Sequence, residues 1–152
     1  MIYWNGLGFE KSYSKAKDYF ELAIDQGNFD SYYYLGYIYE NGKGVQKDLN
    51  KAINYYLKCA ETQSNGSIPD NRNYYRSNND VGLIYLLEQN HQNRELAEKY
   101  IKFAGINEYQ FGQNNLALFL QNFSELKNDF EYFLMKAAKK KFALSEFNLA
   151  HW

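Results

Sequence analysis

Apolar and aromatic residues recur along this chain at the spacing of one face of an α-helix. The clearest stripe is Ala52, Tyr55, Tyr56 and Cys59, at positions i, i+3, i+4 and i+7, the pattern of an amphipathic helix. Equivalent stripes are Ala16, Tyr19, Phe20 and Ala23; Ala97, Tyr100, Ile101 and Ala104; and Phe130, Phe133, Leu134 and Ala137. Each stripe predicts a helix that buries one face.

The residues around these stripes predict where the helices begin and end. Ser12, Asp48 and Asn93 hold one equivalent position ahead of the first three stripes, and their side chains can accept hydrogen bonds from first-turn amides as N-caps. Gly27 and Gly105 follow two of the stripes and suit a helix C-terminus, where a left-handed residue is common.

The helices belong to a repeat. At a shift of 36 residues the chain matches itself without a gap at Tyr3/Tyr39, Gly6/Gly42, Gly8/Gly44, Lys11/Lys47, Lys15/Lys51, Ala16/Ala52 and Tyr19/Tyr55. Looser copies follow, so repeats must be considered before any other organisation. We predict one domain over 1–152, with a partial repeat at 1–27, repeats at 31–60, 77–105 and 112–140, and a partial repeat at 142–152.

A further helix is predicted ahead of the stripes as the first helix of each repeat, and small residues recur at one place in it. These residues are Gly36, Gly82, Ala117 and Ala150. Glycine inside a helix costs about 1 kcal/mol relative to alanine, so we expect a compensating close approach of the paired helix. An isolated helix pair would leave an apolar face in water, which predicts pairs stacked into a solenoid.

The segment Tyr33–Ala60 resembles a Sel-one-like repeat, a branch of the tetratricopeptide superfamily. The residues that carry the resemblance are Leu35, Gly36, Tyr39, Gly42, Gly44, Val45, Asp48, Lys51, Ala52 and Ala60. The resemblance implies an all-α, right-handed α-α superhelix of antiparallel helix pairs. It also implies a non-catalytic adaptor that binds a protein or peptide partner on the concave face, which the first helices line.

Composition narrows the function classes. The chain has 17 basic and 18 acidic side chains and a formal charge of −1, so we expect no nucleic-acid partner. A single cysteine excludes an internal disulfide and favours a reducing compartment. The longest apolar run, Val81–Leu87, is too short to span a bilayer. We therefore expect a cytoplasmic protein that does not insert into membranes.

The residues that could suggest a phosphate-binding, catalytic or metal site are better explained by structural roles in the fold. Gly42 and Gly44 lack the strand and the further glycines of a phosphate-binding loop, so we predict turn glycines with positive φ. Cys59 stands where other copies have alanine and is predicted to be a core residue. His91 and His151 belong to no metal-ligand pattern. We expect no cofactor, no metal and no catalytic residue.

Candidate partner contacts are first-helix positions that differ between copies. One row is Tyr34, Asp80, Asn115 and Asn148, and the next is Tyr37, Leu83, Leu118 and His151. Tyrosine is a good interface anchor because it buries a large area with few rotamers to freeze. The alternative is that Tyr37, Leu83 and Leu118 pack between neighbouring repeats.

Two further features leave alternatives open. The polar segment Thr62–Asn79 is an insertion that either contacts a partner, or is disordered or simply extra length that the fold tolerates. Ile2, Tyr3, Phe147, Leu149 and Trp152 would be uncovered at the ends, which indicates a longer array, end-to-end self-association or a covering partner. The alternative to a free-standing adaptor is a docking segment of a longer protein, either fused to a signalling enzyme or part of an ER-associated ubiquitin-ligase adaptor.

Overall fold

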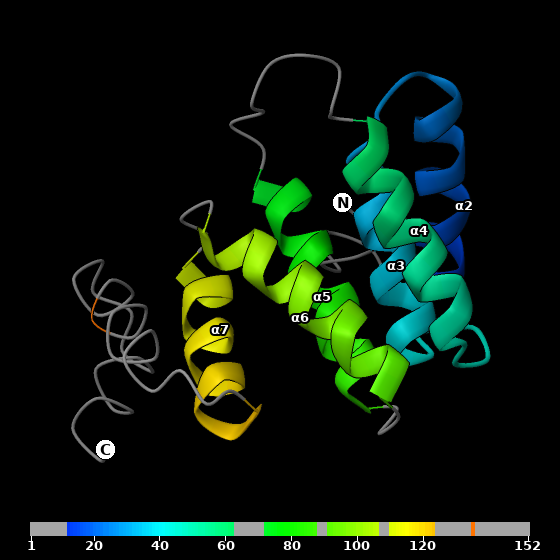
Figure 1. Ribbon diagram of the computed structural model, residues 1–152. Helices are drawn as coiled ribbons and strands as arrows, with labels where there is room; N and C mark the ends of the chain where they lie inside the picture. Colours follow the sequence, from blue (N-terminus) through cyan, green and yellow to red (C-terminus); the bar gives the residue numbers. More distant parts are fainter. Residues whose placement is uncertain (1–11, 63–71, 88–90, 107–109, 124–134, 136–152) are drawn as a thin grey trace. The chain divides into compact units, whose positions relative to one another are not determined.

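The computed structural model describes residues 12–62, 72–87, 91–106, 110–123 and 135. All regular elements in these ranges are α-helices (Figure 1): α2 Tyr13–Asp25, α3 Ser31–Asn41, α4 Leu49–Thr62, α5 Arg72–Leu87, α6 His91–Ile106 and α7 Gln110–Phe123. The all-α prediction is confirmed. The stripe Phe130, Phe133, Leu134 and Ala137 lies outside the described ranges, as do residues 1–11 of the partial repeat at 1–27 and the whole partial repeat at 142–152, which holds Asn148, Ala150 and His151.

Internal contacts divide the chain into two compact units, Met1–Ser77 (unit 1) and Asn78–Trp152 (unit 2). In unit 1, α3 packs against both α2 and α4 (Figure 1). In unit 2, α6 packs against α7. The boundary between the units falls within α5, so this one helix contributes residues to both.

The two ends of α2 follow from their local sequence. Oγ of Ser12 accepts a hydrogen bond from the amide of Lys15 at 3.4 Å, as predicted for an N-cap. After the helix, Gly27 has φ 84°, and the amide of Asn28 donates to the carbonyl of Ala23 at 2.9 Å. This left-handed termination satisfies a carbonyl that the helix cannot pair, so both end predictions are confirmed.

The loop between α3 and α4 is closed by two glycines and an aspartate. Gly42 has φ 63° and Gly44 has φ 70°, which confirms their turn role. The amide of Asp48 donates to the carbonyl of Tyr39 at 2.9 Å. Oδ1 of the same aspartate accepts from the amide of Lys51 at 2.9 Å. Asp48 therefore ties the end of α3 to the beginning of α4.

The small residues of the first helices permit close contact with the second helices. A Cβ atom on Gly36 would lie 2.5 Å from Cδ1 of Tyr56, and one on Gly82 would lie 2.6 Å from Cγ1 of Ile101. The Tyr56 ring is fully buried, and its hydroxyl donates to Oε2 of Glu40 at 2.6 Å. The predicted close approach is confirmed in both units.

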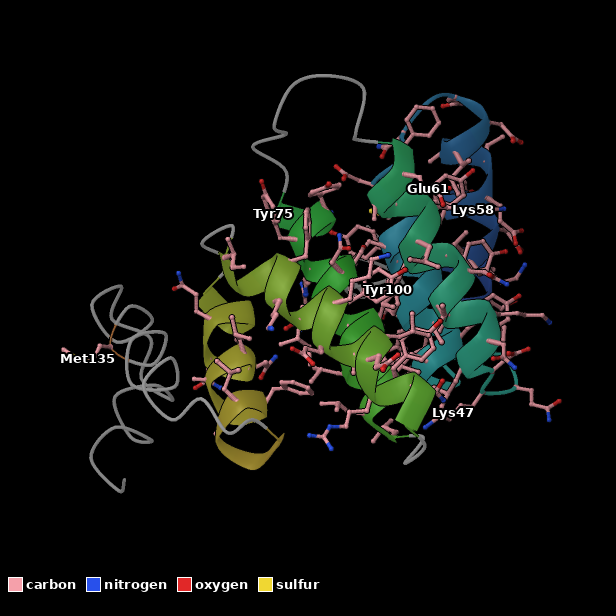
Figure 2. The ribbon with its side chains drawn as sticks, viewed as in Figure 1. Lys47, Lys58, Glu61, Tyr75, Tyr100 and Met135 are labelled. Atoms are coloured by element: carbon pink, nitrogen blue, oxygen red, sulfur yellow. The ribbon has the colours of Figure 1, made fainter. Side chains whose placement is uncertain are left out.

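In two of the repeats, a stacked tyrosine pair joins the first helix to the second helix. The ring centroids of Tyr39 and Tyr55 lie 5.5 Å apart in unit 1. Those of Tyr85 and Tyr100 lie 6.1 Å apart in unit 2, and Figure 2 shows Tyr100 on α6. The two interplanar angles, 15° and 16°, are nearly equal. The repetition seen in the sequence is therefore a repetition of helix-pair geometry.

The role predicted for Gly105 was wrong. Gly105 lies inside α6, which ends one residue later at Ile106. A Cβ atom on this glycine would lie 2.8 Å from Cδ2 of Leu116 and 3.0 Å from the carbonyl oxygen of Gly112. The absent side chain thus makes room for α7. The position demands a small residue because of tertiary packing, which a local end signal cannot reveal.

Two further local predictions were wrong. α6 begins at His91, so Asn93 lies within the helix instead of capping it. The intervening residues are polar and contain no glycine or proline, so nothing prevents the earlier start. Tyr19 is 55% exposed although it lies on a predicted buried stripe. Its equivalents Tyr55 and Tyr100 are only half-buried, so this position lies at the border of the buried face.

The segment Thr62–Asn79 is only partly an inserted loop. From Arg72 onward it forms the first turns of α5, while residues 63–71 lie outside the described ranges. The guanidinium carbon of Arg76 lies 4.7 Å from the centre of the buried Tyr33 ring, a cation–π geometry. Part of the segment therefore stabilises unit 1. Whether the residues before Arg72 contact a partner stays a prediction.

Candidate functional site

In unit 1 the candidate contacts Tyr34 and Tyr37 lie on α3 (the α3 patch), and aromatic packing fixes the first of them. The Tyr34 ring stacks on Phe20 of α2, with centroids 4.9 Å apart and planes 7° apart. It also meets the edge of the buried Tyr33 ring at 5.6 Å. Both patch residues are half-buried. One part of Tyr34 therefore serves the packing of α2 on α3, and the remainder is accessible.

In unit 2 the structure brings together Asp80 of α5 and Asn115 of α7. The buried side chain of Asn79 links them. Nδ2 of Asn115 donates to Oδ1 of Asn79 at 2.8 Å, and Nδ2 of Asn79 donates to Oδ1 of Asp80 at 3.0 Å. These two predicted contacts, 35 residues apart in the sequence, are thus neighbours on the first-helix face.

Apolar side chains flank this polar pair. Leu83 is 36% exposed, and Leu118 is half-buried. Leu87 and Phe111 are 67% and 51% exposed and were missed in the sequence. They could have been found, because each lies four residues along a helix from a predicted contact and thus on the same face. The six residues Asp80, Leu83, Leu87, Phe111, Asn115 and Leu118 form the α5–α7 patch.

The exposure of these residues bears on the alternative that Tyr37, Leu83 and Leu118 pack between repeats. Tyr37 and Leu118 are half-buried, whereas Leu83 is more than one-third exposed. A residue wholly used in packing would be hidden, as Leu116 and Ala117 are on α7. All three therefore retain surface for a partner, Leu83 most clearly. Their role as contacts remains a prediction.

The α5–α7 patch carries very little charge. No Asp, Glu, Lys, Arg or His occurs in Gln110–Phe123, and Asp80 is the one such residue in 78–87. The patch is therefore apolar and amide-rich, with a single carboxylate. In unit 1, by contrast, lysines lie over tyrosine rings. Nζ of Lys58, labelled in Figure 2, lies 5.7 Å from the centroid of Tyr32.

The structure also locates the residues considered as a possible nucleophile or as possible metal ligands. Cys59 is completely buried, which confirms its core position. Burial raises the pKa of its thiol, and the Ser77 hydroxyl opposes this rise only in part, so its thiolate is disfavoured. Within the described ranges no three His, Cys, Asp or Glu side chains are grouped to hold a metal ion. None of the helices described is both long and apolar enough to cross a membrane.

Comparison with known proteins identifies the repeat. The family model for the Sel1 repeat matches residues 1–28 and 29–61. The chain belongs to the Sel1-like repeat family. The match covers the two copies in which the spacing is most regular, and the second includes α3, the glycine loop and all of α4 except its last residue.

Curated Sel1-like relatives are similar over parts of their length. The "ERAD-associated E3 ubiquitin-protein ligase component HRD3B" of Arabidopsis thaliana is 38% identical over 67 residues, 44% of this chain and 11% of that protein. The "Putative sel1-like repeat-containing protein L21" of Acanthamoeba polyphaga mimivirus is 30% identical over 115 residues, 73% of this chain and 19% of that protein. The Sel1-like chain thus spans less than a fifth of either relative.

A solved structure shows the same fold. The crystal structure of a Sel1 repeat protein from Oxalobacter formigenes superposes with a TM-score of 0.72, covering 91% of this chain and 55% of that chain at 24% identity. The fold is thus an α-solenoid built from helix pairs, as the resemblance implied. The hand of its superhelix remains a prediction.

Proposed function

We propose that this Sel1-like chain is a protein-interaction scaffold that binds a protein or peptide partner on its first-helix faces and performs no catalysis itself. The exposed apolar row on α5 and α7, next to the linked pair Asp80 and Asn115, carries the proposal. Exposed apolar side chains gathered around oriented polar groups are typical of interaction surfaces. The repeat class agrees, since stacked helix pairs provide extended binding surfaces.

Comparing equivalent positions in the repeat copies of this chain supports the same assignment. Positions that pack between helices stay small or apolar, such as Gly36 and Gly82. The first-helix row changes from tyrosine at Tyr34 to aspartate at Asp80 and asparagine at Asn115. A surface whose role is packing alone would have no need for this change of chemistry. A surface that recognises one partner requires different groups at different points.

The test is affinity capture from native lysate with quantitative mass spectrometry. The variant Tyr34→Ala/Tyr37→Ala/Leu83→Ala is compared with wild type and with the control Tyr19→Ala/Leu22→Ala, which changes exposed side chains of α2. We expect the captured partner to be lost from the first variant and kept by the control. Unfolding curves establish that both fold. Equal capture by all three proteins would refute the first-helix assignment.

A second candidate is a docking segment within a longer multidomain protein. The relatives support it, because the chain corresponds to only 11% and 19% of the two lengths described above. One of them is named as a ubiquitin-ligase component, which supports an adaptor role of that kind as one form of this candidate. Sequencing the transcript in both directions tests it. An in-frame catalytic domain is expected, and stop codons at both borders would refute it.

A further inference from the structure

The Asn115 carboxamide is held in one orientation with hydrogen-bonding capacity to spare. Within the described part of the chain, the hydrogen bond of Nδ2 to Oδ1 of Asn79 is the one its side chain makes. A primary amide has two N–H donors and an oxygen with two acceptor positions. One N–H and the whole of Oδ1 thus remain, on a side chain that is half-buried and so keeps part of its surface accessible. Its bonding partner Asn79 is 3% exposed and cannot turn away easily.

Apart from the polar side chains of Asn79 and Asp80, apolar side chains flank this amide. Phe111 precedes Asn115 by one turn of α7, and Leu118 follows it by one turn. Leu83 and Leu87 are exposed on α5. A hydrogen bond formed among such groups is protected from water once the surface is covered, and it is then stronger than a bond in open solvent. An amide left unpaired under a partner would cost binding free energy.

A donor and an acceptor on one planar group match the main chain of an extended peptide. Each residue of a peptide presents an N–H and a C=O, and recognition through main-chain bonds is a general mode for extended segments. The low charge of the patch favours the same class of partner. With no Lys or Arg on Gln110–Phe123 or on 78–87, nothing there neutralises phosphate groups, as a nucleic acid would require.

We propose that the α5–α7 patch binds an extended peptide segment, with Asn115 pairing to the main chain of one of its residues. The peptide side chains on either side are apolar and cover Leu83 and Phe111. The carboxylate of Asp80 favours a basic side chain nearby over an acidic one. The positioning residue is Asn79, which holds the carboxamide of Asn115. The inference rests on the proposed function and adds the chemical class of the partner.

The test begins with random peptides displayed on phage and selected on the folded wild-type protein. We expect selected sequences rich in apolar residues with a basic residue. Their binding is measured by fluorescence anisotropy with a labelled peptide. A set of copies, each N-methylated at one amide, then locates the main-chain bond, because N-methylation removes one donor and keeps the side chain. Methylation at one position is expected to lower the affinity of the peptide about tenfold, which corresponds to the loss of a hydrogen bond of about 1.4 kcal/mol.

The link to Asn115 is established by combining the two changes. Asn115→Ala is expected to lose about tenfold in affinity for the unmodified peptide, and to lose little more on N-methylation at the critical position. The matched control is Asn54→Ala, an exposed asparagine of α4, which should behave as wild type. Asn79→Leu should weaken binding in the same direction, because Asn115 is then free to rotate. Unfolding curves show that each variant folds.

The outcomes separate this inference from the proposed function. If peptides bind, but Asn115→Ala keeps the same sensitivity to N-methylation as wild type, main-chain recognition by Asn115 is wrong and the scaffold function stands. If the selected peptides are predominantly acidic, or if polyanionic RNA competes for the patch, the partner class is wrong. If no peptide is enriched and the native-lysate capture is also unaffected by the first-helix variant, both proposals fail.

Discussion

Replacing Gly36 with alanine tests whether close helix approach determines the repeat geometry. In wild type the ring of Tyr56 occupies the space that a Cβ atom on this glycine would need, at 2.5 Å from both Cδ1 and Cε1. The ring cannot retreat easily. It is fully buried, lies against Tyr33 with centroids 5.4 Å apart, and donates its hydroxyl proton to Glu40.

Two effects of opposite sign set the change in the free energy of unfolding that Gly36→Ala causes. Alanine inside a helix is favoured over glycine by about 1 kcal/mol. Overpacking a well-packed core typically costs about 1–3 kcal/mol, and the fixed Tyr56 ring places Gly36→Ala at the upper end of this range. We therefore expect the free energy of unfolding to fall by about 1–2 kcal/mol. Helix propensity alone predicts a rise, so the sign of the change decides between the two.

The assay is urea unfolding followed by far-UV circular dichroism. The control Asn54→Ala makes an alanine substitution on the exposed face of α4 and should raise stability slightly. In the background Tyr56→Leu the ring is absent, so Gly36→Ala should be much less costly, with a coupling free energy above about 0.5 kcal/mol. A Gly36→Ala protein as stable as wild type, or a coupling near zero, would refute the close-approach argument.

Three other predictions use the same unfolding assay. Asp48→Ala should cost about 1 kcal/mol through loss of the N-cap. Lys51→Ala keeps the amide that Asp48 caps and removes an exposed ion pair with Asp48 and a cation–π contact with Tyr39, so it should cost less. Gly27→Ala should cost about 1–2 kcal/mol because φ at this position is 84°; an unchanged midpoint would contradict this. Burial raises the pKa of the Cys59 thiol above the ordinary value of a cysteine. The unfolded chain therefore loses this proton first, and stability should fall as pH rises through the ordinary thiol range. Cys59→Ala should flatten this part of the pH profile, and an identical profile would contradict the assignment.

Much of the fold follows from short-range signals in the sequence. Apolar spacing within α4, the cap at Ser12 and the positive-φ glycines each involve residues a few positions apart, whose geometry is set by the helix itself. The repetition then multiplies each signal, so that the pairing of Gly36 with Tyr56 predicts that of Gly82 with Ile101. The signals were least reliable at helix ends, as Asn93 shows, because the cost of extending a helix by a turn is small.

The candidate site was predictable only in part. The period placed Asp80, Leu83, Asn115 and Leu118 on first helices, and helical spacing alone could have added Leu87 and Phe111. It could not show that Asn79 joins Asp80 to Asn115. That link depends on α5 and α7 lying together, and hydrogen bonds between residues 36 apart have no local signature.

The sequence by itself thus determined the repeat class, the helix pairs and the positions of close contact, because these are periodic and local. Only the tertiary structure decided how individual residues are used. It placed Gly105 in a contact with α7 instead of at a helix end, and it showed that residues 72–79 of the apparent insertion belong to α5. It also showed that Asn115 is oriented by a buried partner. Each of these outcomes depends on which surfaces meet, and packing between distant segments settles that.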